Sequence, residues 1–130
     1  MHTISNTLIC DFYNANPSSM FVAIDNVAQM QAKKKVLILG DMFEMGNEAA
    51  AEHTAVINKA MAAPVDVRIF IGKEFADIAK SDQRYQADTN KFYINAEEAM
   101  EHLKANPITD ATVLIKGSRG MALERLVGLF

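Results

Sequence analysis

The stretch KVLILGDMFEMG, residues 35–46, decides the fold. After Lys35 come four consecutive apolar residues, 36–39, a pattern typical of a parallel strand that is covered on both faces. Two glycines and several polar or methionine residues follow directly, as expected of a loop at the carboxyl end of such a strand. The stretch therefore predicts a buried strand over 35–39 that leads into an unusual loop.

Runs of the same kind recur along the chain and alternate with segments of helical periodicity. The additional strands are expected at residues 7–12, 67–71, 91–94 and 112–115. The helices are expected at about 17–30, 49–60, 73–79, 96–105 and 122–129. This alternation predicts one α/β domain over 1–130: a Rossmann-like, open and mostly parallel sheet of about five to six strands, with helices on both faces.

Asparagines mark the expected helix starts. Asn16 precedes Pro17, and Asn47 and Asn95 each precede glutamates, so all three are expected as N-cap residues.

The composition excludes several classes of protein. The chain has 130 residues, of which 50% are hydrophobic, and a net charge of −3, which argues against a nucleic-acid partner. It has no apolar run near the roughly 20 residues of a membrane helix, and no secretory signal pattern at its start. A single cysteine, Cys10, fits a reducing compartment, and three scattered histidines do not suggest a zinc site. We expect a soluble, cytoplasmic domain without a membrane partner.

Three polar loops follow strands and are expected to meet at one edge of the sheet: residues 11–20, 40–46 and 116–120. In the last, Lys116 and Arg119 flank a glycine and a serine, which suits a phosphate or a carboxylate. Asp11 either caps a turn or binds a ribose hydroxyl.

Other residues of these segments have simpler interpretations. Asn16 with its proline fits a plain helix cap, and Asp41 and Glu44 fit solvated carboxylates. His53 lies on the apolar face of its predicted helix, which favours a hydrogen-bonded core histidine over a ligand.

No complete set of catalytic groups is found in the sequence. It has neither a G-x-x-x-x-G-K-[ST] phosphate loop nor a G-x-G-x-x-G fingerprint, and no Ser/His/Asp or Cys/His arrangement. We therefore predict no catalytic residue and no metal ligand in this chain.

Taken together, the motifs closely resemble the C-terminal domain of the Mur ligase family, over about residues 6–130. They are D-F-Y-N-A-N-P-S-S-M at 11–20, L-G-D-M-F-E-M-G at 39–46 with His53 after it, and I-K-G-S-R-G-M-A-L-E at 115–124. The resemblance is to the members that add D-Ala-D-Ala to UDP-MurNAc-tripeptide in peptidoglycan synthesis. It implies an ATP-dependent, magnesium-assisted ligase of three domains, of which this chain has only the third, so that the isolated domain is inactive.

The resemblance also implies roles for individual residues. Asp11, Asn14 and Asn16 would face the nucleotide. The positions that would face the incoming dipeptide or line the closure surface are Asp41, Glu44, Lys116, Ser118 and Arg119. The two absent domains would be the partners of this one and would bind most of the ATP and Mg²⁺. The isolated domain would bind neither of them.

Two other interpretations stay open at the level of sequence. A receiver-like signalling domain would explain Asp11 and Lys116, but its phosphoacceptor aspartate should end the third strand, where this chain has residues 71–73, Ile-Gly-Lys. A non-catalytic α/β interaction domain would need an exposed apolar patch.

Overall fold

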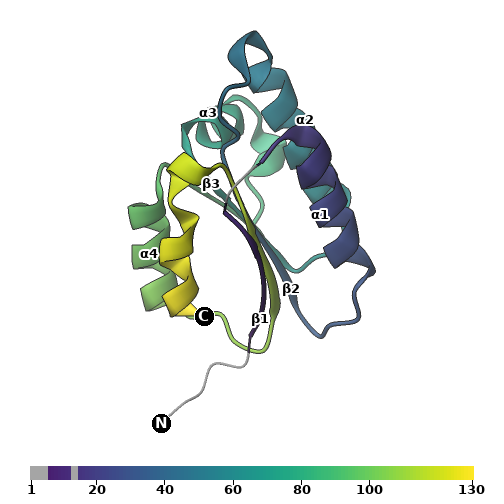
Figure 1. Cartoon of the computed structure of the whole chain (residues 1–130), viewed down its shortest axis with the longest axis vertical. Helices are drawn as coiled ribbons and strands as arrows, with labels where there is room; N and C mark the ends of the chain where they lie inside the picture. The colour runs from purple at the N-terminus through teal and green to yellow at the C-terminus, as the bar shows by residue number, and fades with distance from the viewer. Residues whose placement is uncertain (1–5, 13–14) are drawn as a thin grey trace.

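The computed structural model describes residues 6–12 and 15–130, which form a three-layer α/β domain (Figure 1). The strands are β1 (Thr7–Asp11), β2 (Lys35–Gly40), β3 (Val67–Ile71), β4 (Asn90–Tyr93) and β5 (Thr112–Lys116). The α-helices are α1 (Pro17–Gln29), α2 (Ala49–Ala62), α3 (Lys73–Ser81) and α4 (Ala96–Ala105). Four 3₁₀ segments complete it: η1 (Gly46–Glu48), η2 (Gln83–Tyr85), η3 (Arg119–Met121) and η4 (Leu123–Leu129).

The sheet has five strands in the order β1-β5-β2-β3-β4, and every pair is parallel. The predicted parallel α/β fold is thus confirmed, and no strand end differs from the predicted one by more than one residue. Because β5 returns to lie between β1 and β2, the loop after β5 is flanked by the loops after two other strands.

The direction of each crossover decides which face a helix covers. The connections through α1, α2 and α3 all advance across the sheet in one direction, whereas the connection through α4 runs back from β4 to β5. Since such crossovers are right-handed, the reversal places α4 on the opposite face from α1 and α2. Figure 1 shows α1 and α2 on one side of the sheet, with α4 and η4 on the other.

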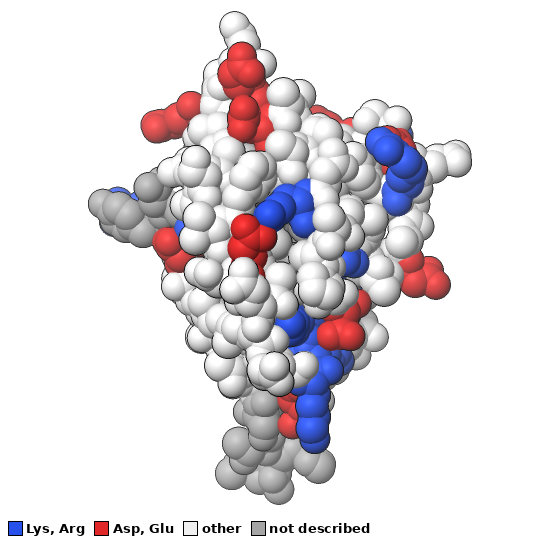
Figure 2. All heavy atoms as spheres, turned by 90° about the vertical axis from the view of Figure 1, so that its right-hand side faces the viewer, with Lys and Arg blue, Asp and Glu red and all other residues white. Residues whose placement is uncertain are grey.

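Each face has its own apolar core. Met20, Ile57 and Phe75, from α1, α2 and α3, pack on one face, and Leu103 and Leu126, from α4 and η4, pack on the other. The outer face of α1 and α2 is mostly uncharged, and the acidic and basic side chains on it are scattered, with some lying side by side (Figure 2).

The structure corrects two local predictions. The last helix is a 3₁₀ helix, η4, in which leucines recur every third residue at 123, 126 and 129, the spacing that aligns side chains in a 3₁₀ helix. Asn47 does not cap α2, because it lies inside the turn η1, and Glu48 stands at the cap position without a side-chain bond. Asn95 does cap α4, by accepting a hydrogen bond from the Glu98 N–H (2.9 Å).

Candidate functional site

The β2 loop, residues 41–46, and the β5 loop, residues 117–121, are joined by hydrogen bonds. The Phe43 N–H donates to Ser118 Oγ (2.8 Å), and the Ser118 N–H donates to the backbone carbonyl of Asp41 (3.2 Å). Two of the three segments singled out in the sequence therefore form one continuous surface at the carboxyl ends of the strands, as predicted.

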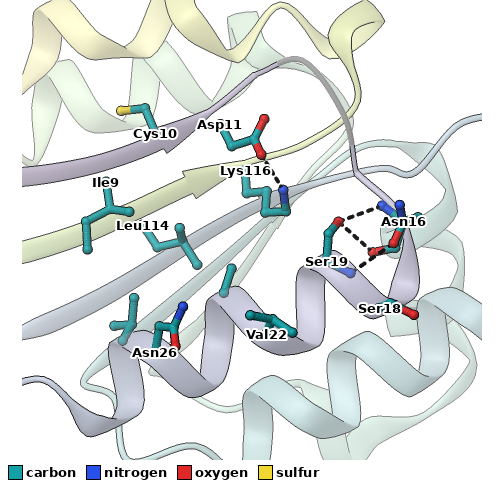
Figure 3. Close-up of a pocket in the computed structure, with 12 residues that line it drawn as sticks. Ile9, Cys10, Asp11, Asn16, Ser18, Ser19, Val22, Asn26, Leu114 and Lys116 are labelled. Carbon is teal, nitrogen blue, oxygen red and sulfur yellow. Dashed lines mark hydrogen bonds and ion pairs between the residues drawn. The ribbon is translucent and has the colours of Figure 1, made fainter.

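The third segment joins them through an ion pair between Asp11 and Lys116. These residues are register partners on β1 and β5, and Lys116 Nζ lies 2.7 Å from Asp11 Oδ2 (Figure 3). The side chain of Lys116 is only 4% exposed, whereas that of Asp11 is 48% exposed. The resemblance placed Asp11 toward the nucleotide and Lys116 toward the dipeptide or the closure surface, but the structure brings the two side chains together.

A cavity of about 560 Å³ begins at this ion pair and runs between the sheet and α1. Ile9 and Leu114 from the sheet and Val22 from α1 give it apolar walls, as Figure 3 shows. Asn16 and Ser18, at the start of α1, line its polar end beside the ion pair. The arrangement suits a ligand with an apolar body and a polar end.

Asn16 itself is committed to the start of α1. Its Oδ1 accepts a hydrogen bond from the Ser19 N–H (2.9 Å), and Ser19 Oγ accepts one from the Asn16 N–H (3.1 Å), which together form a capping box. The cap predicted from sequence is confirmed. Asn14, which the resemblance also assigned to the nucleotide, lies outside the described residues.

Asp41 differs from its predicted solvated state, because it is buried, with 4% of its surface exposed. Its carboxylate accepts hydrogen bonds from the N–H groups of Glu74 (2.9 Å) and Phe75 (3.2 Å) in the first turn of α3. Asp41 thus caps a helix that has no capping side chain of its own, since Gly72 stands at its N-cap position. Burial raises the pKa of the Asp41 carboxyl above its ordinary value, and the two N–H groups offset this only in part.

This environment gives a prediction for the pH dependence of stability. A carboxyl with a higher pKa in the folded chain than in the unfolded chain contributes stability that is lost as the pH rises through the folded pKa. The stability lost on Asp41→Asn should therefore shrink as the pH rises from about 4, the ordinary pKa of aspartate, toward neutrality. Urea unfolding of both proteins across this range measures the difference; a difference that grows with pH would contradict the prediction.

His53, on α2, is the buried, hydrogen-bonded histidine that its apolar surroundings predicted. Its Nε2 accepts a hydrogen bond from the Met42 N–H (2.9 Å), and its Nδ1 lies 2.6 Å from the Ala49 carbonyl oxygen. The ring packs edge-on against Phe75, with 4.8 Å between ring centroids.

The remaining predicted residues divide by exposure. Glu44 is exposed, as expected, and Arg119 is exposed as well, whereas Ser118 is buried beneath the β2 loop. Phe43 is 45% exposed although it is aromatic. In both loops the first two residues, 41–42 and 117–118, are buried, and the next two, 43–44 and 119–120, are exposed.

Gly72 and Lys73, after β3, are not among the residues that the sequence predicts for the site. Lys73 lines two further cavities, of about 320 and 310 Å³, that lie on either side of Asp41 and Phe43. One signal could have pointed to them. No Asn, Asp, Ser or Thr precedes α3, so the cap of this helix has to come from elsewhere in the fold.

Among the residues that the structure describes, no group of three or more His, Cys, Asp or Glu is placed to hold a metal ion. No helix in the described part of the chain is long and apolar enough to cross a membrane.

Comparisons with known proteins agree with these motifs. The family model for the Mur ligase, glutamate ligase domain, matches residues 1–119. The UDP-N-acetylmuramoyl-tripeptide–D-alanyl-D-alanine ligase of Treponema pallidum is 37% identical over 123 residues, which cover 94% of this chain and 27% of that protein. The enzyme of the same name from Escherichia coli is 33% identical over 92% of this chain and 26% of its own length.

Solved structures give the same result. MurF from Acinetobacter baumannii superposes with a TM-score of 0.79 and 27% identity, over 98% of this chain and 28% of that one. MurF ligase from Thermotoga maritima, solved in complex with ADP, has a TM-score of 0.72 at 20% identity, over 98% of this chain and 29% of that one, and shows the shared fold. This chain spans about a quarter of the length of the curated relatives it matches. It belongs to the Mur ligase family, as a C-terminal, glutamate ligase domain similar to that of MurF.

Proposed function

We propose that this chain is the C-terminal domain of an ATP-dependent ligase that joins D-Ala-D-Ala to UDP-MurNAc-tripeptide in the cytoplasm, a step of peptidoglycan synthesis. The observation that carries the proposal is the meeting of the three motif segments at one edge of the sheet, through the Asp11–Lys116 ion pair and the Phe43–Ser118 hydrogen bond. Relatives that span this chain almost completely bear the name of that enzyme.

The proposed reaction forms one amide bond. ATP supplies the phosphoryl group that activates the carboxylate of the tripeptide, after which the amine of D-Ala-D-Ala displaces phosphate. We assign magnesium binding mainly to the other domains of the ligase, since the described residues bring no three His, Cys, Asp or Glu side chains together. The contribution of this domain is therefore to bind and orient substrates, and orientation is a large part of the barrier for two reacting molecules.

On the nucleotide side, we assign Asp11, Asn14 and Asn16. The assignment is best supported for Asp11, because its carboxylate is half exposed and is held in place by the buried Lys116. Asn16 shapes the end of the 560 Å³ cavity by starting α1, although its side-chain oxygen is used within the capping box.

On the side of the incoming dipeptide, or of the surface on which the domains close, we assign Asp41, Glu44, Lys116, Ser118 and Arg119. Glu44 and Arg119 are the exposed members and are placed to meet a ligand or another domain. Asp41 and Ser118 are buried and act by holding the two loops in place.

The proposal is tested with the purified 130-residue chain beside the full-length ligase that contains it. We expect the chain alone to fold but to turn over no ATP above a buffer blank, because its sequence has no phosphate loop. The full-length protein should release phosphate only when both UDP-MurNAc-tripeptide and D-Ala-D-Ala are present.

Two outcomes would contradict the proposal. ATP turnover by the chain alone would show that this domain has an ATP-hydrolysing site of its own. Phosphate release that does not depend on D-Ala-D-Ala would show that the dipeptide is not the attacking amine. A receiver-like domain would instead take up phosphate from a small phosphodonor. The family match, and a strand order different from the 2-1-3-4-5 of flavodoxin-like folds, speak against that alternative.

A further inference from the structure

The start of the β2 loop is held at three consecutive residues by three different elements. The Asp41 carboxylate binds the first turn of α3, the Met42 N–H donates to His53 on α2, and the Phe43 N–H donates to Ser118 of the β5 loop. A segment that only connected β2 to α2 would not need so many fixed points.

The hydrogen bonds of His53 define its tautomer. Because Nε2 accepts from the Met42 N–H, it carries no proton, and Nδ1 carries the proton that it donates to the Ala49 carbonyl (2.6 Å). Ala49 lies one turn earlier on α2, so the helix itself fixes the ring. The ring is completely buried and packs edge-on against Phe75, and the Asp41 carboxylate oxygen lies farther from Nε2, at 3.8 Å, than the Met42 nitrogen does.

Beyond the fixed residues, the backbone takes a strained turn. Glu44 has a φ of +63°, a left-handed conformation that is uncommon for a residue other than glycine, asparagine or aspartate. Such strain persists only where the surrounding structure determines it. Glu44 is exposed and lines the 310 Å³ cavity, so the anchored loop fixes the backbone position from which the Glu44 side chain reaches the surface.

We propose that His53 is a positioning residue of the ligase. By accepting a hydrogen bond from the Met42 N–H, it holds the β2 loop in the conformation that places Glu44 on the side of the incoming D-Ala-D-Ala. The inference rests on the proposed function for the substrate, and on the structure for the hydrogen bonds. His53 does not contact substrate; its effect passes through the backbone of Met42.

The test compares two replacements of His53 in the full-length ligase. In His53→Gln, the side-chain carbonyl can still accept the Met42 N–H, whereas His53→Leu fills the apolar site without an acceptor. We expect His53→Leu to lower kcat/KM for D-Ala-D-Ala about ten- to a hundredfold, the range that small misplacements near a reacting centre produce. The KM values for ATP and UDP-MurNAc-tripeptide should stay within about twofold, and His53→Gln should restore most of the loss.

His102→Leu is the matched control. His102 lies on α4, on the opposite face of the sheet from α2, and its ring packs at a tilt against that of Tyr93, with 5.4 Å between ring centroids. The same chemical change there should leave kcat/KM for D-Ala-D-Ala within about twofold of the unaltered ligase, the scatter expected of a site without a role in transition-state binding.

Glu44→Gly keeps the experiment decisive if His53→Leu folds poorly. Glycine adopts the left-handed conformation readily, so this variant should melt no lower than the unaltered protein but should lose activity with D-Ala-D-Ala. Unchanged activity of Glu44→Gly would overturn the proposal, as would equal losses in His53→Leu and His53→Gln that affect all three substrates alike.

Nitrogen-15 NMR of the 130-residue chain separates this inference from the proposed function. The spectra should show a protonated Nδ1 and an unprotonated Nε2 on His53. The chemical shift of the Met42 amide should move away from its hydrogen-bonded value in His53→Leu but not in His53→Gln. A protonated Nε2 would overturn the inference even if the ligase is active. An inactive full-length ligase with the expected spectrum would refute the proposed function alone.

Discussion

Replacing Gly72 with alanine is expected to lower the free energy of unfolding of this domain by roughly 3 kcal/mol, the largest stability effect that the structure indicates. Gly72 has a φ of +133°, which side chains rarely allow, and an added Cβ would overlap the carboxylate of Asp41. Because that carboxylate caps α3, it has no room to move without giving up its hydrogen bonds to Glu74 and Phe75. Strain and overlap each cost about 1–3 kcal/mol.

Two other glycines provide controls for this prediction. Gly46 also has a positive φ, +56°, but no atom lies within 4 Å of an added Cβ, so Gly46→Ala should cost only the strain, about 1 kcal/mol. Gly128 has neither a positive φ nor a close neighbour, and its replacement should stay within about 0.5 kcal/mol. Urea unfolding of the three variants measures the order; equal midpoints for Gly72→Ala and Gly46→Ala would refute the capping role of Asp41.

A loss of activity as large as that of His53→Leu is expected at the Asp11–Lys116 ion pair. In the full-length ligase, Asp11→Ala should lower kcat/KM for ATP about ten- to a hundredfold, because a charged hydrogen bond contributes about 1.5–3 kcal/mol. Lys116→Met should have a similar effect, since Lys116 fixes the carboxylate of Asp11 at 2.7 Å. If the two act as a unit, the double variant should lose little more than either single variant.

Lys116→Met is expected to disturb folding less than Asp11→Ala does. It replaces a buried cation with an apolar chain of similar shape and leaves behind a carboxylate that is half exposed to water. Lys59→Met is the control, because Lys59 makes an ion pair of the same length, 2.7 Å, with Asp25 on the outer surface of α1 and α2. That change should leave both activity and the melting temperature nearly unaltered.

The same experiment tests the role that the resemblance gave to Lys116. A rise in the KM for D-Ala-D-Ala after Lys116→Met, with the KM for ATP unchanged, would show that Lys116 acts on the dipeptide side alone and has no functional link to Asp11. Arg119→Met belongs in the same series. We expect it to raise the KM for D-Ala-D-Ala, because Arg119 is exposed at the edge of the β5 loop.

The sequence by itself determined the features that depend on near neighbours in the chain. Runs such as 36–39 predicted buried parallel strands, because a strand covered on both faces needs apolar residues at every position. Asn16 and Asn95 predicted two helix starts, because capping joins residues only three positions apart. The loops that carry the site followed from these limits, since ligands of parallel sheets meet the carboxyl ends of the strands.

Only the tertiary structure decided the partners within the site. Asp11 meets Lys116 across 105 positions because β5 inserts beside β1, and Asp41 caps α3 through Glu74, 33 positions later, because α3 starts beside the end of β2. Local periodicity is the same for every order of parallel strands, so it carries no information about which strand ends become neighbours. The packing of helices on the two faces selects that order, and with it which carboxylates are buried and which reach the surface.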